Sequence, residues 1–351
     1  MHIRTYIRKG AVALVAAAAL AMGTASAQDK PVELTFSVWI PANHPLVKDF
    51  MMPWAKQVEE ATQSRVKIRF LPKPVTNPVG HYDAVRNGLV DLAFISNSYY
   101  PGRLDLMKFA MLPFSGNSAE ATSVAVWRTY DKYLRPVDLY RGVKLLGLYG
   151  HGPGAVFTTG RKIEKVEDFN GLRLRIGGGM QADVAKALGV NAIVKPAPES
   201  YELMSTGVVD GVFFPPESIS SFRLVSLVKQ ATLFPGGLYA DVHSIIMNPK
   251  AFDKLSPADQ QALLKLSGEH IARMGGEAWG AADTAALKDM KEAHTDIHVA
   301  DAELVSGVKA RTAPIQAEWL AAAKSRHVDG PQVLDYFHSQ LKTLENAPQE
   351  D

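Results

Sequence analysis

Val32-Glu33-Leu34-Thr35-Phe36-Ser37-Val38 decides the class of this fold, because apolar and polar residues alternate strictly along it. Such period-two alternation is typical of a β-strand with one buried face. The alternation returns at 65–70, and an apolar run follows at 91–96. Helical patterns at 43–62 and 82–88 separate these three strands. The order strand, helix, strand, helix, strand predicts an α/β fold with a parallel sheet covered by helices.

Further along the chain, the pattern predicts a second lobe. Gly150-His151-Gly152-Pro153-Gly154 breaks the periodicity and marks the expected crossover, and a second series of short strands and helices follows it. The apolar strand 242–247 is expected to return to the first sheet. We therefore predict lobe 1 at 28–152 plus about 241–280, and lobe 2 at 153–240 plus about 281–351.

One long helix is expected to cross both lobes. Helical periodicity starts after Ser256 and continues to about residue 293, with interruptions at Gly275-Gly276 and Gly280. A helix of roughly 35 residues would be about 50 Å long. This length exceeds one small domain, so the helix should run across the two.

Residues 1–27 have the composition of a cleavable signal peptide. Arg4, Arg8 and Lys9 form a basic start, the apolar run AVALVAAAALAM follows at 11–22, and Ala25-Ser26-Ala27 supplies the small residues of a cleavage site. The run is much shorter than the roughly 20 residues of a membrane-spanning helix. The mature chain should begin near residue 28 and lie in the periplasm.

The charge balance excludes a nucleic-acid partner. The chain has 38 basic and 36 acidic residues. Removal of the three basic residues of the signal peptide brings the net charge to about −1, so no basic surface is implied. The chain contains no cysteine, which suits an oxidising compartment without requiring one.

The sequence carries none of the motifs that would mark a common enzyme site. It lacks HExxH, the G-x-S-x-G elbow and the G-x-x-x-x-G-K-[ST] phosphate loop. No metal or cofactor is expected. A secreted enzyme acting on small acids stays open as an alternative, although no acid–base pair can be placed.

The segment EDFNGLRLRIGGG at 167–179 contains the main candidate site residue. Its strand carries Arg173 and Arg175 on one face, and Arg175 lies nearer the carboxyl end, where ligands bind in open α/β sheets. The glycines that follow lead into a helix N-terminus, which favours anions. Arginine binds carboxylates with two parallel hydrogen bonds. Arg175 is therefore a candidate carboxylate clamp, whereas Arg173 is expected to form a surface ion pair; position alone leaves the same surface role open for Arg175.

The chain resembles the periplasmic solute receptors of tripartite ATP-independent periplasmic (TRAP) transporters, the DctP family. The resemblance rests on landmarks that span nearly all of the mature chain in family order. They are Leu34-Thr35-Phe36-Ser37-Val38-Trp39, Met111-Leu112-Pro113-Phe114, the block at 167–176, Ala187-Leu188-Gly189, Glu199-Ser200-Tyr201-Glu202-Leu203, Thr206-Gly207-Val208-Val209-Asp210-Gly211, Met247-Asn248-Pro249 and Leu255-Ser256-Pro257-Ala258-Asp259-Gln260-Gln261.

The resemblance implies a two-lobed periplasmic binding protein of type II-like α/β fold, with a long helix across both lobes. Arg175 matches the arginine with which family members pair a substrate carboxylate. The implied partners are the TRAP membrane permease subunits. A C4-dicarboxylate or other organic-acid receptor of the same family and a periplasmic sensor subunit remain alternatives.

Two departures from the family narrow the ligand. Some sugar-acid receptors carry a second arginine where this chain has Ala155, and an asparagine where it has Phe214. Other members hold a metal beside a 2-oxoacid with Glu-Trp, where this chain has Phe213-Phe214, which cannot ligate a metal. Sugar acids and metal-bridged 2-oxoacids therefore fit poorly.

The other candidate ligand contacts are mostly aromatic. Trp39 and Phe214 rank first because each ends a predicted strand. The further candidates are Phe213, Tyr100 and Tyr239, with the polar residues Asn97, His151 and Glu217. Together with Arg175 they predict a monocarboxylate with an apolar or aromatic body. A monomer is expected, and the long helix permits a dimer.

Overall fold

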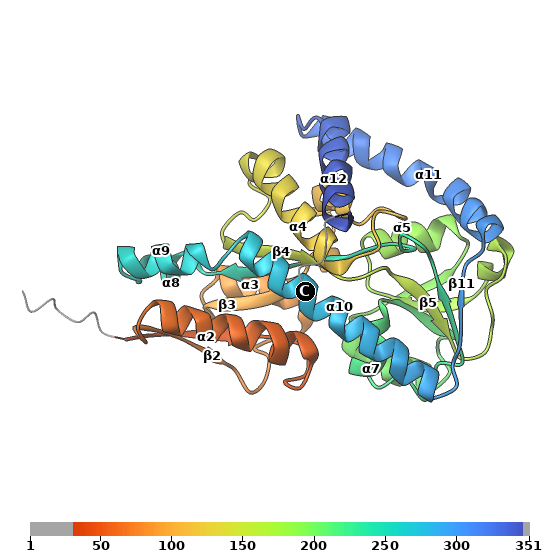
Figure 1. The fold of residues 1–351 in the computed structure, drawn as a ribbon, viewed down its shortest axis with the longest axis horizontal. Coiled ribbons are helices and arrows are strands. Elements are labelled where there is room, and N and C mark those ends of the chain that lie inside the picture. Colours follow the sequence, from red (N-terminus) through yellow and green to blue (C-terminus); the bar gives the residue numbers. More distant parts are fainter. Residues whose placement is uncertain (1–30, 347–351) are drawn as a thin grey trace, which may run out of the picture.

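The structure, a computed structural model, describes residues 31–346; the predicted signal peptide lies outside them. Two β-sheets lie side by side in separate lobes, each covered by helices (Figure 1). The chain crosses from the first sheet to the second between Gly150 and Ala155, where the crossover was predicted. The predicted two-lobed α/β fold is confirmed.

The first sheet has five strands in the order β2-β1-β3-β10-β4. Their bounds are β1 Val32–Ser37, β2 Val66–Phe70, β3 Leu92–Ser96, β4 Lys144–Gly150 and β10 Val242–Met247. Strand β1 is parallel to β2 and β3, whereas β10 is antiparallel to β3 and β4. The expected return of β10 to this sheet is confirmed, but the sheet is mixed. The reason is that β10 enters from the second lobe, at the edge where β3 and β4 end.

The second sheet has six strands in the order β11-β9-β5-β8-β6-β7. Their bounds are β5 Ala155–Thr158, β6 Arg173–Ile176, β7 Asn191–Val194, β8 Gly211–Phe214, β9 Gln230–Leu233 and β11 Asp296–Val299. Strand β6 is parallel to β7 and β8, and β5 is antiparallel to β8 and β9. The sequence pattern did not predict β9, whose sequence QATL contains only two apolar residues.

Helices and short helical turns surround the sheets. The helices are α2 Met52–Ala61, α3 His81–Arg86, α4 Ala119–Thr129, α5 Met180–Ala187, α6 Ser200–Ser205, α7 Pro216–Ser221, α8 Pro249–Asp253, α9 Pro257–Lys265, α10 Glu269–Glu292, α11 Ala302–Ser325 and α12 Gly330–Glu345. The π-helical and 3₁₀ segments are η1 Leu46–Met51, η2 Pro78–Gly80, η3 Asn97–Tyr99, η4 Asp105–Ala110, η5 Tyr130–Leu134, η6 Arg135–Val137, η7 Val166–Phe169 and η8 Ala197–Glu199.

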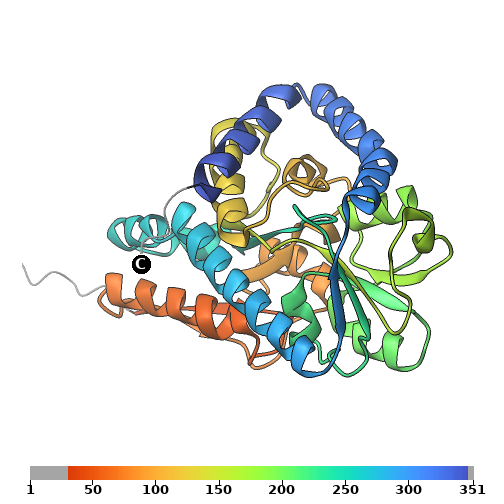
Figure 2. The ribbon, with the colours of Figure 1, turned by 45° about the vertical axis from the view of Figure 1, so that its right-hand side comes forward.

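Helix α10 is the predicted long helix, and it is shorter than expected. It packs against α4 and β4 in the first lobe and against α7 in the second, so it does span both (Figure 2). The single helix predicted from Ser256 onward is wrong, because Gly268 adopts a left-handed φ of +66° and separates α9 from α10. The 24 residues of α10 correspond to about 36 Å.

The glycines predicted to interrupt this helix lie inside it. A Cβ on Gly275 would come within 2.8 Å of the Tyr149 ring, and one on Gly276 within 2.6 Å of the Glu120 backbone. These glycines therefore let α10 pack closely against β4 and α4. The glycines that the sequence pattern predicted to break the helix are the positions where α10 contacts its neighbours.

The two C-terminal helices bridge the lobes on the other side of the molecule. Helix α11 contacts α5 and η4, and its Trp319 Nε1 donates to the Leu106 carbonyl at 3.1 Å. Helix α12 packs against α4, and Figure 2 shows the arch that the two helices form. The boundary placed at 281–351 for the second lobe therefore stays a prediction.

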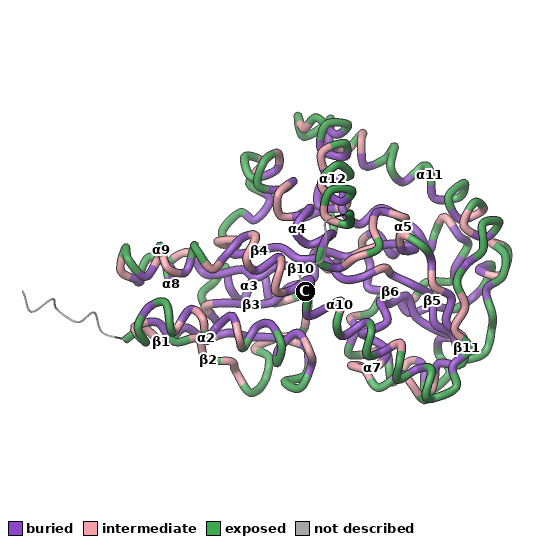
Figure 3. The backbone as a smooth tube through the Cα atoms, viewed as in Figure 1, coloured by how far each residue is buried: buried purple, intermediate pink, exposed green. Residues whose placement is uncertain are grey.

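The core follows the central strands of both sheets. Every residue of β3, β5, β8 and β10 is buried, and Figure 3 shows β3, β5 and β10 inside the exposed outer faces of the helices. Burial on both faces is expected where helices cover a sheet on each side. Within residues 31–346, none of the helices has the length and apolarity to cross a membrane.

Candidate ligand-binding site

A small cavity of about 40 Å³, lined mostly by buried residues, lies between the two lobes. The first lobe, the crossing segments, the second lobe and α10 all contribute walls. The lining residues are Trp39, Ile40, His44, Leu46, Phe94, Ser96, Tyr99, His151, Arg175, Gly177, Gln181, Ala197, Phe214, Pro215, Glu217, Ser218, Phe222, Asp241, His243 and Trp279. Five predicted site residues, Arg175, Trp39, Phe214, His151 and Glu217, thus meet in one cavity.

Arg175 is the charged centre of this cavity. Its side chain is 1% exposed, Nε donates to the Lys195 carbonyl at 2.8 Å, and Nη1 has no hydrogen-bond partner within residues 31–346. Burial lowers its pKa, opposed by Tyr99 and Tyr239, yet a guanidinium stays protonated in proteins. A buried cation without a counter-ion is costly. The cavity is therefore built to receive an anion.

The strand places its two arginines in different environments. Arg173 lies at the exposed start of β6 and pairs with Asp210, with Nε 3.1 Å from Oδ2. The expected surface ion pair of Arg173 is confirmed. Arg175 lies two residues further on at the buried end, where the β6–α5 turn is fixed by the Gly177 amide donating to Gln181 Oε1 at 2.7 Å.

Aromatic rings form the apolar walls. Trp39 stacks on Phe94 with ring centroids 4.9 Å apart, and Phe214 stacks on Phe222 at 5.6 Å. The Arg175 guanidinium carbon lies 4.5 Å from the centre of the Phe214 ring, which is cation–π geometry. A ring-bearing anion would therefore meet both a cation and flat apolar surfaces.

The structure does not bring Asn97 and Tyr100 to the cavity. Asn97 Nδ2 donates to the Tyr140 hydroxyl at 2.8 Å, and its Oδ1 accepts from Ser244 at 2.7 Å. The Tyr100 hydroxyl accepts from the Tyr82 amide at 3.2 Å. Both side chains are engaged inside the first lobe, because they follow β3 on turns that point back into it.

Phe213 and Tyr239 also lie outside the cavity lining. Successive side chains of a strand point to opposite faces, so Phe213 faces away from the side on which Phe214 lines the cavity. Phe213 stacks instead on Tyr239 at 5.9 Å. Tyr239 stands behind His151, with ring centroids 5.4 Å apart, and supports the wall from outside.

Sequence reasoning missed several wall residues, Trp279 and His44 above all. Trp279 comes from α10, and nothing in a helical pattern tells which of its turns crosses a cleft. His44 belongs to the loop after β1, and its Nε2 lies 3.0 Å from Glu217 Oε1 on α7 in the other lobe. This contact joins elements far apart in the sequence.

The Glu217 carboxylate is already engaged within the protein. It accepts from His44, from Ser218 Oγ at 3.0 Å and from Ser221 Oγ. The Leu46 amide donates to His44 Nδ1 at 3.3 Å, so the His44 proton lies on Nε2 and points at Glu217. Burial lowers the pKa of His44, although the nearby Glu217 acts to raise it. The His44–Glu217 pair therefore holds the lobes together as a neutral histidine bound to a carboxylate.

Further contacts across the cleft hold the lobes closed. Lys108 Nζ lies 2.6 Å from Asp183 Oδ2, and the Ala197 amide donates to the Tyr99 hydroxyl at 3.0 Å. A benzene-sized ligand occupies a cavity of about 150 Å³, more than the about 40 Å³ seen here. An aryl ring therefore requires the lobes to separate. An adjoining open cleft that shares Trp39, Ile40 and Phe222 with the cavity provides a route.

The profile of the DctP family, described as bacterial extracellular solute-binding protein, family 7, matches residues 36–322. The chain belongs to this family. The match spans most of both lobes, including the strand that carries Arg175. The sequence resemblance to TRAP solute receptors is thereby confirmed.

Solved structures of other family members resemble this receptor closely. A TRAP periplasmic solute-binding protein from Bordetella bronchiseptica with bound (R)- and (S)-mandelate is 53% identical with a TM-score of 0.88, covering 90% of this chain and 100% of that one. An aromatic-acid-specific TRAP protein from a marine metagenome, in complex with 3-hydroxybenzoate, is 27% identical with a TM-score of 0.84, covering 90% and 99%. The curated relative TsaT of Comamonas testosteroni, named an outer membrane transporter protein, is 29% identical over 93% of this chain and 96% of its own length.

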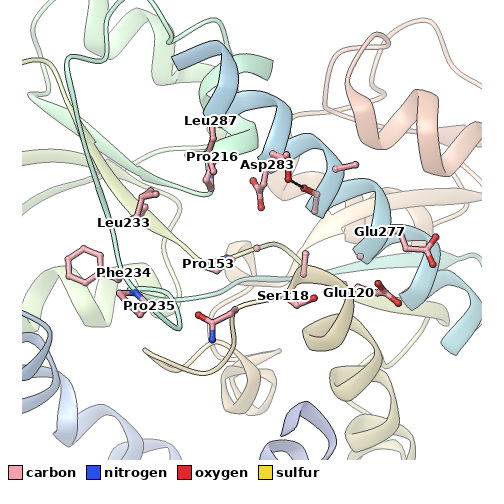
Figure 4. A pocket seen from close by; sticks show the side chains of 18 of the residues that line it. Ser118, Glu120, Pro153, Pro216, Leu233, Phe234, Pro235, Glu277, Asp283 and Leu287 are labelled. Carbon is pink, nitrogen blue, oxygen red and sulfur yellow. Dashed lines mark hydrogen bonds between the residues drawn. The ribbon is translucent and has the colours of Figure 1, made fainter. Parts of the chain in front are cut away.

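A larger and more open groove lies along α10, on the outer side of the crossing segments (Figure 4). It measures about 650 Å³, and its walls include Glu120, Pro153, Phe234 and Asp283. Among the residues that the structure describes, no arginine or lysine lines it. Of the two, the cavity between the lobes is the one that contains the buried Arg175.

Besides His44, the cavity of the receptor holds two further buried histidines that are neutral near pH 7. Burial lowers the pKa of His151 to about 4 and that of His243 to about 3. Asp241, between them in the wall, has a raised pKa because it is buried, against the opposing effect of His151. Within residues 31–346, no three His, Asp or Glu side chains are grouped so as to hold a metal ion.

These histidines make the receptor's stability depend on pH. A histidine whose folded pKa is depressed binds fewer protons in the folded than in the unfolded state, so stability falls as pH drops below about 6.5. For His243, with a folded pKa of about 3, the loss at pH 4.5 is roughly 2–3 kcal/mol. We expect His243→Phe, which keeps an aromatic ring among Phe94, Tyr149 and Trp279, to reduce the drop in melting temperature between pH 7 and pH 4.5 by several degrees.

Thermal melts of both proteins at the two pH values measure this difference. The opposing contribution of Asp241 is present in both proteins and largely cancels in the comparison. An equal drop in wild type and variant would show that His243 does not stay neutral in the folded protein.

Proposed function

We propose that this chain is an extracytoplasmic receptor that binds a monocarboxylate with an aromatic or apolar body and delivers it to a TRAP membrane complex. The observation that carries the proposal is Arg175, a buried cation against the Phe214 ring in an aromatic cavity, whose Nη1 has no hydrogen-bond partner within residues 31–346. Export by the signal peptide at 1–27 would bring the receptor to the periplasm, where the membrane permease subunits are its partners.

The remaining charges in the cavity favour a single carboxylate. Arg175 is the one arginine or lysine among the lining residues, and depressed pKa values keep His44, His151 and His243 neutral near pH 7. The Glu217 carboxylate would repel a second anionic group. A C4-dicarboxylate would therefore bury one carboxylate without a counter-ion.

The relatives support an aromatic ligand. The Bordetella bronchiseptica protein has bound mandelate and the metagenome protein has bound 3-hydroxybenzoate. Both ligands combine one carboxylate with one aryl ring, which matches the cation and stacked rings of this cavity. The proposed activity is binding and release without chemical change, and the match to a family of solute-binding proteins supports it.

A thermal-shift screen of the mature protein tests this function. We expect benzoate, phenylacetate and mandelate to raise the melting temperature by several degrees, because a ligand at 100 times its Kd stabilises the folded state by about 2.7 kcal/mol. Succinate and fumarate should have little effect. A shift with the dicarboxylates alone, or conversion of a bound acid to a new product, would contradict the proposal.

A further inference from the structure

Five buried polar atoms of the cavity-lining residues have no hydrogen-bond partner within residues 31–346: Arg175 Nη1, His243 Nδ1, Trp39 Nε1, His151 Nε2 and Trp279 Nε1. Two of these residues, His151 at 3% exposed and Trp279 at 4% exposed, have adjoining rings. Buried polar groups are almost always hydrogen-bonded, so each such atom calls for an explanation. Both residues line the same cavity as Arg175.

His151 presents a hydrogen-bond acceptor to the cavity. Its Nδ1 lies in hydrogen-bond contact with the Gly152 carbonyl oxygen, which can only accept, so the ring proton is on Nδ1. Burial lowers the pKa of His151 to about 4, so the ring is neutral near pH 7. Nε2, on the opposite side of the ring, therefore carries a free lone pair.

Trp279 presents a hydrogen-bond donor beside it. An indole N–H can only donate, and the Trp279 ring lies 5.6 Å from the His151 ring and 4.8 Å from the His243 ring, centre to centre. Helix α10 brings Trp279 to this wall from outside both sheets. A free acceptor and a free donor thus lie on adjoining rings.

The nearby carboxylate does not compete for these atoms. Asp241 accepts from Ser96 Oγ at 2.6 Å, from Ser98 Oγ at 2.7 Å and from the Val242 amide at 2.8 Å. His243 Nε2 lies 3.9 Å from Asp241 Oδ2, beyond hydrogen-bond distance, and its Nδ1 is also without a partner among the described residues. Besides Arg175 Nη1 and Trp39 Nε1, the buried polar atoms of the cavity lining that lack a partner within residues 31–346 are therefore nitrogens of His151, His243 and Trp279.

We propose that His151 and Trp279 form a hydroxyl subsite, so that the ligand is a hydroxy-substituted carboxylic acid. Its carboxylate binds Arg175, its hydroxyl donates to His151 Nε2, and the hydroxyl oxygen accepts from Trp279 Nε1. A ketone would only accept and would leave His151 unmatched, whereas an ammonium group would only donate and would leave Trp279 unmatched. The inference rests on the proposed function and specifies the ligand class of that site.

Matched pairs of acids test the subsite on the wild-type protein. Calorimetry with mandelate against phenylacetate, and with 3-hydroxybenzoate against benzoate, compares ligands that differ by one hydroxyl. We expect the hydroxy acid to bind about 10- to 100-fold more tightly in at least one pair, because the acid without it leaves both nitrogens unpaired.

Two variants assign the preference to these residues. Trp279→Phe removes the donor and keeps an aromatic ring, and His151→Phe removes the acceptor. Each is expected to reduce the preference for the hydroxy acid to within about threefold, while the affinity for the acid without the hydroxyl changes little. Trp127→Phe on α4, outside the cavity lining, is the matched control and should keep the full preference. If His151→Phe does not fold, the result for Trp279→Phe alone tests the hydroxyl subsite.

The outcomes separate the subsite from the receptor function itself. If the two acids of each pair bind equally tightly, and Arg175→Ala abolishes the binding of all of them, the hydroxyl subsite is overturned. The proposed function as a carboxylate receptor is then retained. Equal weakening of both members by Trp279→Phe would show a structural role for the indole and also overturn the subsite. Failure of every acid to bind would overturn the proposed function, and the subsite with it.

Discussion

Replacement of Arg175 by alanine is expected to weaken binding of an aromatic monocarboxylate by roughly 30-fold to several-thousand-fold. Truncation of one partner of a buried, hydrogen-bonded charge pair costs about 2–5 kcal/mol. Arg175 is 1% exposed, and its Nη1 has no partner in the described part of the chain, so the ligand carboxylate would lose its only cation. Isothermal calorimetry with the acid that gives the largest thermal shift measures the loss.

Arg173→Ala provides the matched control from the same strand. Its guanidinium lies at the surface, paired with Asp210, so the affinity should change by less than about threefold. Arg175→Lys keeps the charge but loses the planar pair of donors. Its affinity for the acid should therefore lie between those of Arg175→Ala and wild type. Equal losses for Arg173→Ala and Arg175→Ala, or undiminished binding by Arg175→Ala, would refute the clamp.

The position of Arg175 at the cavity could be predicted from sequence because the information is local, whereas its role as a carboxylate clamp is implied by the family resemblance. A strand end, a glycine turn and a following helix all lie within 167–180, so the orientation of one side chain follows from the pattern around it. Trp39 and Phe214 were found for the same reason, since each ends a strand. Because successive side chains of a strand point to opposite faces, the same pattern indicates that Phe213 and Phe214 do not both line the cavity.

The rest of the site depends on contacts between distant segments. Trp279 reaches the cavity because α10 crosses the cleft, and His44 meets Glu217 because two lobes close on each other. No local sequence pattern predicts either contact, because each joins segments that lie far apart in the chain. The break at Gly268 was missed because Ser256 to residue 293 is helical in composition, whereas the left-handed turn is set by close packing of Trp127 and a bond from the Gly268 amide to the Leu146 carbonyl.

Gly211, at the start of β8, is the position where we expect a single methyl group to damage the fold most. A Cβ there would lie 2.1 Å from the Phe157 carbonyl oxygen and 2.9 Å from the Thr158 Cα, both backbone atoms of the neighbouring strand β5. On the other side, Gly211 is in register with Leu174 of β6, whose side chain would lie 3.1 Å away. Neither neighbour can move without disturbing the sheet that carries Arg175.

Gly211→Ala should therefore lower the free energy of unfolding by roughly 3 kcal/mol or more, at or beyond the upper end of overpacking costs. The melting temperature should fall by about 6–12 °C, or the variant should fail to accumulate in soluble form. Gly160→Ala is the control, because a Cβ there meets nothing within 4 Å and the residue follows the same strand β5. Thermal melts of the three proteins measure the effect, and a Gly211→Ala protein that melts within 2 °C of wild type would show that β5 and β8 are not packed as closely as described.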